Sequence, residues 1–185
     1  MGVSAEVINH ERKDKIGTYG NLSFRLSNKN SSFYITGRNV HKGHLKTSDI
    51  CAIIDVDFTK EDSIYAKVSY QGMIKPSIDS AIHAAIYNET DCTHIVHIHT
   101  NKVFLGYPLT DYNYPCGSGE EKEAILNFIL ENKTHQIIQL YKHGLIILGH
   151  SFSECSHLID KLFKFTPYID YDKKDFLYIK DMEII

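Results

Sequence analysis

The segment Thr93–Thr100 is the feature of this sequence that most restricts its fold. It is an apolar, β-branched run, THIVHIHT, of the kind found in buried strands. Side chains alternate between the two faces of a strand, so His97 and His99 project from one face while Val96 and Ile98 project from the other. Two imidazoles side by side on a rigid strand form half of a metal site. The chain contains 11 histidines, however, and chance alone supplies about 0.7 pairs with this spacing, so the rest of the sequence must decide what the pair does.

Length and charge restrict the class of protein. With 185 residues, 43% of them hydrophobic, the chain can form a single domain, residues 1–185, with a substantial core. It has 20 Lys and Arg against 23 Asp and Glu, a net charge of −3, which argues against nucleic acid or a membrane surface as the main partner. The longest apolar runs are too short to span a bilayer.

The N-terminal residues and the cysteines indicate the cellular compartment in which we expect the protein. The first residues, MGVSAEVINHERKDK, lack the apolar stretch of a signal peptide. The four cysteines are widely spaced and form no C-x-x-C pair. We therefore expect a cytoplasmic protein with reduced thiols.

Hydrophobic periodicity predicts intermixed strands and helices without the regular rhythm of a doubly wound sheet. The predicted strands are 22–26, 32–36, 50–58, 64–68, 94–99, a hairpin of 137–141 with 145–148, and a short strand at 176–179. The predicted helices are 76–88, with Ser77 as its N-cap, 120–131 and 153–165. We expect an α/β (α+β-like) fold with a central, mostly antiparallel or mixed sheet covered by helices.

Two further segments carry side chains suited to chemistry. The segment 75–80, KPSIDS, brings Ser77 and Asp79 to the start of a helix. The segment 142–145, KHGL, places His143 in a turn. Each has an ordinary structural explanation, since Ser and Asp stabilise helix N-termini and His-Gly occurs in hairpin turns.

The order of these segments resembles that of the class II aldolase/adducin family. GNLS, an ITG turn, PSxD-x3-H-x3-Y, H-x-H and HG follow one another from about Gly20 to Phe165, and the most specific part is Pro76–His99. The resemblance implies the family's fold and a site for Zn²⁺ or another divalent transition metal. Its implied ligands are His97, His99 and His143. Three neutral nitrogens with an open position are typical of a catalytic metal site.

The resemblance also implies roles around the metal. Asp79 occupies the position of the acid/base carboxylate, where the aldolases usually have Glu and the pentulose-phosphate 4-epimerases have Asp. Because Asp is one methylene shorter than Glu, the alternative is that Asp79 binds the metal and does not reach the substrate carbon. Glycine turns and a helix N-terminus would bind the substrate's phosphate through backbone N–H groups. The residues implied for the phosphate are Gly20, Asn21, Thr36, Gly37 and Ser77. Ile78 replaces a second hydroxyl residue, for which Arg38 or Lys42 could compensate by their charge.

The segment after the H-x-H pair departs from the family, because 100–115 is short where a longer helix usually stands. Asp111, Tyr112 or Tyr114 could supply the second acid/base group, or this stretch is a surface loop. Family aldolases also use a C-terminal tyrosine from a neighbouring subunit. Candidates for it are Tyr168, Tyr171 and Tyr178.

The resemblance implies a metal-dependent lyase, an aldolase, that cleaves a small sugar phosphate through a zinc-stabilised enediolate. The alternatives are a sugar-phosphate 4-epimerase or dehydratase of the same family, and a non-catalytic adducin-like module. Asp79 and the Asp111-Tyr112 pair favour the epimerase, and the short loop favours the module, although the module would predict degraded metal ligands. Because the family forms cyclic tetramers, a homo-oligomer is expected.

Overall fold

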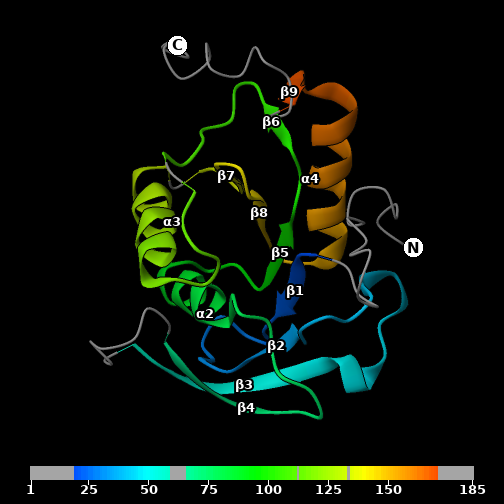
Figure 1. The fold of residues 1–185 in the computed structure, drawn as a ribbon, viewed down its shortest axis with the longest axis vertical. Coiled ribbons are helices and arrows are strands. Elements are labelled where there is room, and N and C mark those ends of the chain that lie inside the picture. Colours follow the sequence, from blue (N-terminus) through cyan, green and yellow to red (C-terminus); the bar gives the residue numbers. More distant parts are fainter. Residues whose placement is uncertain (1–18, 59–65, 112, 133, 171–185) are drawn as a thin grey trace.

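A seven-stranded antiparallel sheet organises the fold (Figure 1). The structure is a computed structural model that describes residues 19–58, 66–111, 113–132 and 134–170. The strand order is β4-β3-β2-β1-β5-β8-β7, and each neighbouring pair is antiparallel. The strands are β1 (Asn21–Phe24), β2 (Phe33–Thr36), β3 (Ile50–Asp57), β4 (Lys67–Gln71), β5 (His94–Ile98), β7 (Ile137–Leu140) and β8 (Gly144–Gly149). The H-x-H strand therefore lies in the interior of the sheet, as a buried apolar strand should.

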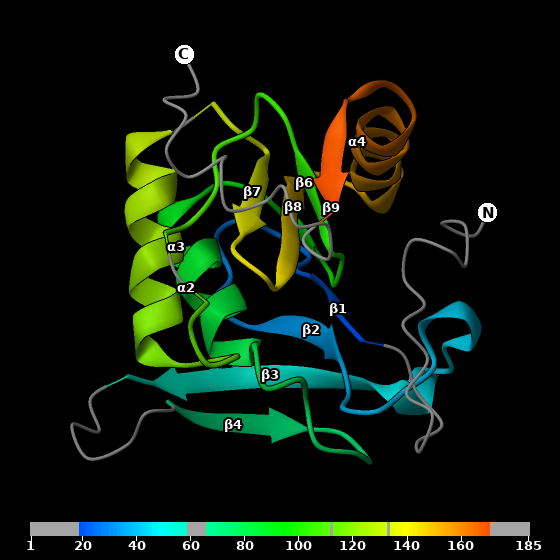
Figure 2. The same ribbon diagram turned by 45° about the horizontal axis from the view of Figure 1, so that its top comes forward.

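Helices cover both faces of the sheet (Figure 2). The α-helices are α2 (Ser80–Glu89), α3 (Gly119–Glu131) and α4 (Phe152–Phe165), and two 3₁₀ turns cover Lys42–His44 and Thr47–Asp49. Ile95 of β5 packs in one core cluster with α2 and α3, whereas Val96 and Ile98 pack with α4 in the other. By alternation, His97 and His99 lie on the face covered by α2 and α3. No helix among the described residues is long and apolar enough to cross a bilayer.

A buried arginine joins the end of α2 to the sheet. Arg25, which is 4% exposed, directs its guanidinium at three backbone carbonyls. Nε donates to Cys92 O at 2.9 Å, Nη1 to Tyr87 O at 2.8 Å and Nη2 to Thr90 O at 2.8 Å. These carbonyls belong to the last turn of α2 and the chain just after it, where a cation also suits the helix dipole. Arg25 thus fixes α2, whose other end carries Asp79, against the sheet.

The predicted fold class is confirmed, with corrections at the ends of elements. Ser77 is not the N-cap, because α2 begins at Ser80. The backbone before α2 is instead tied to the end of β2: Ser77 N–H donates to Thr36 O, and Pro76 bridges Gly37. Tertiary pairing here outweighs the local capping preference.

Three further strand assignments need comment. The strand predicted at 64–68 is β4, which begins at Lys67, and the prediction's first two residues lie outside the described ranges. The strand predicted at 176–179 also lies outside them. No pattern in the sequence indicated β6 (Lys102–Phe104) and β9 (Tyr168–Asp170), which pair with each other in a second, two-stranded sheet of the described residues. All four cysteines are free, as expected.

Candidate metal centre and acid–base site

Three histidines converge where β5 ends and β8 begins. His97 and His99 come from one face of β5 and its extension, and His143 from the turn that leads into β8, the strand paired with β5. The ring centroids of His97 and His99 lie 4.8 Å apart, those of His97 and His143 4.8 Å, and those of His99 and His143 4.6 Å. One nitrogen from each ring lies within 4.8 Å of the others. This is the ligand set predicted from the sequence.

Gly144 explains why the turn can approach the end of β5. A Cβ at this position would lie 1.9 Å from the carbonyl oxygen of Ile98, and its φ is +147°. Only glycine tolerates both the contact and the conformation. His143, one residue earlier, is therefore held beside His99.

His97 is oriented as a metal ligand. Its ring is 3% exposed, and Nδ1 lies 3.1 Å from the carbonyl oxygen of Leu145. A carbonyl can only accept, so Nδ1 carries the hydrogen and Nε2 presents a lone pair to the cluster. Among the described parts of the chain, that Nε2 has no hydrogen-bond partner. Burial, reinforced by the neighbouring histidines, holds the pKa of His97 well below its usual range, which favours the neutral form that binds metals.

A buried carboxylate orients His143. Glu121, 3% exposed, accepts a hydrogen bond from His143 Nδ1 through Oε1 at 2.7 Å. Its Oε2 accepts from the Gly117 N–H at 2.7 Å. A carboxylate on the outer nitrogen is the usual support of a metal-binding histidine. The three rings and this support fit a divalent metal such as Zn²⁺.

Glu121 and Cys116 together change the proton affinity of His143. Burial lowers the pKa of this ring, but hydrogen bonds with Cys116 and Glu121 outweigh burial and raise the pKa to about 10. The Cys116 Sγ lies 3.1 Å from His143 Nε2. A metal on Nε2 would therefore displace a proton from this ring.

The sequence analysis missed Glu121, although a signal was present. The spacing Ser118-x-x-Glu121 is that of a capping box at a helix start. The Ser118 hydroxyl does accept from the Glu121 N–H at 3.1 Å, so the cap of α3 forms. A capping box would have the Glu121 carboxylate accept from the Ser118 backbone N–H. The carboxylate accepts instead from the Gly117 N–H and from His143 Nδ1.

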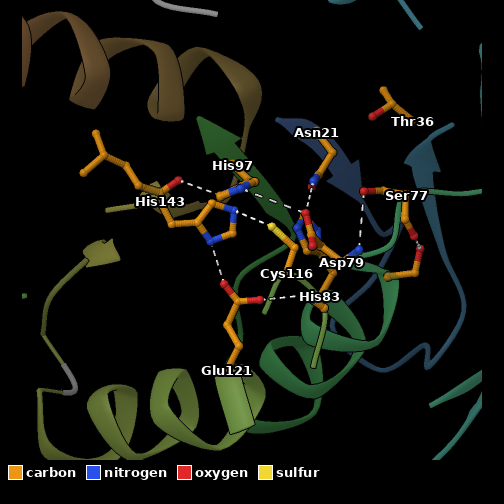
Figure 3. A network of polar contacts seen from close by, with 12 residues as sticks. Asn21, Thr36, Ser77, Asp79, His83, His97, Cys116, Glu121 and His143 are labelled. Atoms are coloured by element: carbon orange, nitrogen blue, oxygen red, sulfur yellow. Dashed lines mark hydrogen bonds and ion pairs between the residues drawn. The ribbon is translucent and has the colours of Figure 1, made fainter. Parts of the chain in front are cut away.

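Asp79 lies beside the histidines with its carboxylate almost buried, at 6% exposure (Figure 3). Its Oδ2 accepts from Asn21 Nδ2 at 2.6 Å and lies 4.0 Å from His97 Nε2. Burial, with the nearby charge of Glu121, raises the pKa of Asp79 to about 6. A carboxyl group with a pKa near neutrality is suited to take up and return protons. Oδ1 is buried and has no hydrogen-bond partner among the residues that the structure describes.

Asn21, predicted to bind phosphate, contacts the acid/base candidate instead. It lies opposite His97 in the β1–β5 pairing, so the two side chains share a face. Its amide donates to Asp79, as described above. Gly20, predicted with it, packs against the carbonyl oxygen of His97.

The other predicted phosphate residues come together where the end of β2 meets the chain before α2. The Ser77 N–H donates to Thr36 O at 3.2 Å, and the Gly37 N–H donates to Asp49 O at 2.8 Å. The backbone donors of Gly37 and Ser77 are thus engaged within the protein. The Thr36 hydroxyl is buried and accepts from the Leu22 N–H at 3.2 Å, and the Ser77 hydroxyl accepts from the Asp79 N–H at 3.4 Å. Both residues lie on the side of Asp79 away from His143 (Figure 3).

Of the two predicted charged compensators, Arg38 lies at the same corner. Arg38 Nε donates to the carbonyl oxygen of Pro76 at 3.0 Å, and its charge acts on Asp79. Lys42 is nearly buried and donates to Val40 O at 3.2 Å.

The candidates for the second acid/base group have different positions. Tyr114 lines a small pocket together with Glu121 and His143, whereas Asp111 is exposed. Tyr168 lies in β9, where the Lys102 Nζ is 3.7 Å from its ring centroid. Tyr112, Tyr171 and Tyr178 lie outside the described residues.

Comparison with known proteins gives one family. The model described as the class II aldolase and adducin N-terminal domain matches residues 8–164. Methylthioribulose-1-phosphate dehydratase of Leptospira biflexa is 32% identical over 92 residues, which cover 49% of this chain and 41% of that protein. Its counterpart from Persephonella marina is 34% identical over 83 residues, 45% of this chain and 34% of that protein. The matches thus span less than half the length of these relatives.

Solved structures show the same fold at lower identity. L-fuculose-1-phosphate aldolase from Thermus thermophilus aligns with a TM-score of 0.57 at 17% identity, covering 86% of this chain and 82% of that chain. A sugar-phosphate aldolase from Thermotoga maritima aligns with a TM-score of 0.56 at 16% identity, covering 78% of this chain and 81% of that chain.

Proposed function

The chain belongs to the class II aldolase and adducin family, and on that premise we propose that it is a metal-dependent lyase acting on a small sugar phosphate. The observation that carries the proposal is the juxtaposition of three histidine ligand atoms with the buried Asp79 carboxylate, 4.0 Å from His97 Nε2. Three imidazole ligands beside an acid/base carboxylate suit metal-assisted chemistry at a carbon next to a carbonyl group.

His97, His99 and His143 would hold the divalent ion, with Zn²⁺ the first choice for three imidazoles. When bound, the ion supplies a Lewis acid that stabilises negative charge developing on the substrate's carbonyl oxygen. The orphaned, buried Nε2 of His97 supports this role, because an unpaired buried acceptor is costly unless something binds it.

Asp79 would move the proton. Its pKa of about 6 allows the carboxylate to take a proton from the carbon beside the carbonyl and to return it at neutral pH. Asn21 holds Oδ2, so Oδ1 is the oxygen that would reach the substrate. Thr36, Ser77 and Arg38 would hold the phosphate and position the reacting carbons.

Two lyase reactions share this proton transfer. In dehydration, Asp79 removes the proton next to the carbonyl, and hydroxide leaves from the following carbon. In aldol cleavage, the hydroxyl on the following carbon gives its proton to the second acid/base group as the bond between those two carbons breaks and the aldehyde forms. Asp79, in its protonated form, then protonates the carbon that keeps the electron pair. The resemblance of the ordered motifs gave aldol cleavage as the first interpretation, whereas the activity named for the relatives that are 32% and 34% identical favours dehydration.

The first test is metal content. We expect untagged protein to retain near-stoichiometric zinc, manganese or cobalt, or to take it up, and His97→Ala to lose it. Protein that binds no divalent metal, before or after its addition, would refute both lyase reactions.

The second test separates the reactions. The metal-loaded protein is incubated with a panel of ketose 1-phosphates, and products are identified by mass spectrometry. Loss of one water supports dehydration, and release of dihydroxyacetone phosphate with an aldehyde supports aldol cleavage. Neither product from any substrate would favour the non-catalytic module. Sedimentation velocity tests the proposed homo-tetramer.

A further inference from the structure

A tyrosine ring covers one of the candidate metal ligands. The ring centroids of Tyr19 and His99 lie 5.2 Å apart, and the two ring planes are inclined by only 19°, so the rings are stacked. Both side chains are half-buried. The ordered motifs of the sequence begin at Gly20, one residue after Tyr19, and do not include it.

The register of two paired strands brings these rings together. In the antiparallel pair of β1 and β5, Asn21 lies opposite His97. Continued by two residues, the same register places Tyr19 opposite His99, on the face of the sheet that carries His97. Gly20 permits this close approach, because its φ is +82° and a Cβ there would clash with the carbonyl oxygen of His97. The backbone therefore holds the Tyr19 ring against His99.

Stacking can orient a metal ligand without blocking it. The lone pair of an imidazole nitrogen lies in the plane of the ring, whereas a stacked neighbour occupies one face of the ring. The Tyr19 ring thus restricts the orientation of the His99 plane and does not stand between a ring nitrogen and an ion. The other two histidine ligands are each oriented by a hydrogen bond on Nδ1. The ring contact gives His99 a comparable support.

We propose that Tyr19 is a positioning residue of the metal centre, which holds the His99 ring in its metal-binding orientation and so raises the affinity of the site for the ion. This inference rests on the proposed metal site. The stack should tighten when His99 binds a cation, because a cation draws electron density from the imidazole, and an electron-poor ring is attracted to the face of a phenol ring.

Titration of the apo-protein with Co²⁺, followed in the visible absorption bands, tests this role in wild type, Tyr19→Phe, Tyr19→Leu and Tyr19→Ala. Phe keeps the aromatic face, whereas Leu keeps only apolar bulk. We expect Tyr19→Phe to bind within about twofold of wild type, and the Leu and Ala variants to bind ~2- to 12-fold more weakly.

The spectrum at saturating Co²⁺ separates positioning from a contribution to folding alone. The visible bands should match wild type in Tyr19→Phe and change in Tyr19→Leu and Tyr19→Ala, because the His99 ring then changes its orientation at the ion. A contribution to folding alone would lower the melting temperature of the apo-protein and leave the saturated spectrum unchanged.

A tryptophan at the same position tests the stack in a second way. The sequence contains no tryptophan, so Tyr19→Trp carries a single indole beside His99. We expect Co²⁺ to quench its fluorescence as the site fills. The matched control is Tyr70→Trp on β4, which is four strands from β5 in the sheet, about 19 Å at the usual strand spacing. The emission of this control should change little.

Several outcomes would overturn the inference and leave the proposed function standing, because wild type would still bind the ion. They are equal Co²⁺ affinity of wild type and Tyr19→Ala, a saturated spectrum that is the same in both, equal weakening of Tyr19→Phe and Tyr19→Ala, and quenching in Tyr19→Trp no stronger than in Tyr70→Trp. Failure of wild type to bind Co²⁺ at all would refute the metal site itself.

Discussion

Replacing Glu121 by Gln should weaken metal binding without touching a metal ligand. The wild-type carboxylate accepts two hydrogen bonds, from His143 Nδ1 and from the Gly117 N–H, each at 2.7 Å. A glutamine has one oxygen and one NH₂ group in their place. If its oxygen faces His143, the NH₂ group opposes the Gly117 N–H. If its oxygen faces Gly117, the NH₂ group donates to Nδ1, which forces the hydrogen onto Nε2 and removes the lone pair that a metal needs.

The size of the effect follows from this conflict. Loss of a residue that orients a metal-binding histidine lowers metal affinity by ~10- to 100-fold, which corresponds to about 1.4–2.7 kcal/mol. The Gln variant should lie in this range. Because Glu121 is 3% exposed, solvent cannot replace the lost hydrogen bonds.

The assay is competition for Zn²⁺ against a chromophoric chelator, with wild type, Glu121→Gln and Glu120→Gln measured side by side. Glu120 is the adjacent, exposed residue in the first turn of α3, so it controls for the loss of one negative charge near the helix N-terminus. We expect Glu120→Gln to bind Zn²⁺ like wild type. The reasoning is refuted if Glu121→Gln also binds like wild type, or if the two variants are weakened equally.

Three further predictions follow from single residues. Asp79→Asn should bind Zn²⁺ near-normally and lose ~100- to 10,000-fold in kcat in the lyase assay, and a fall of less than tenfold would remove Asp79 from the proton-transfer step. Arg25→Met should lower the free energy of unfolding by about 3 kcal/mol or more in urea titrations, because it leaves three carbonyls without their donor. Arg25→Lys should lower it by less. Equal stability of wild type, Arg25→Met and Arg25→Lys would contradict the capping role. His83 is fully buried, and burial lowers its pKa to about 3 from 6.5, so its contribution to stability is complete above about pH 6.5 and is lost as the pH falls toward 3. The loss of unfolding free energy between about pH 7.5 and about pH 5 should therefore be about 2 kcal/mol smaller in His83→Phe than in wild type, and identical losses would show that His83 titrates normally in the fold.

Much of the fold could be predicted because its signals are local. The helix at 120–131 is α3 within one residue, and the hairpin around His143 is present with Leu140 opposite Gly144. Ser77 was misplaced because its backbone pairs with Thr36, a partner that no local pattern reveals. The pair β6 and β9 is likewise made by segments that lie far apart in the chain.

The sequence by itself determined which side chains could face one another along a single element. A period of two puts His97 and His99 on one face of a strand, whereas His143 was added to the ligand set only by the resemblance of the ordered motifs to the class II aldolase/adducin family. The tertiary structure alone decided what surrounds these ligands. Asn21 meets Asp79 because β1 pairs with β5, and Cys116 and Glu121 meet His143 because α3 packs beside the β7–β8 turn. Such contacts join residues on separate elements, and their geometry depends on strand register and helix packing, which only the folded chain defines.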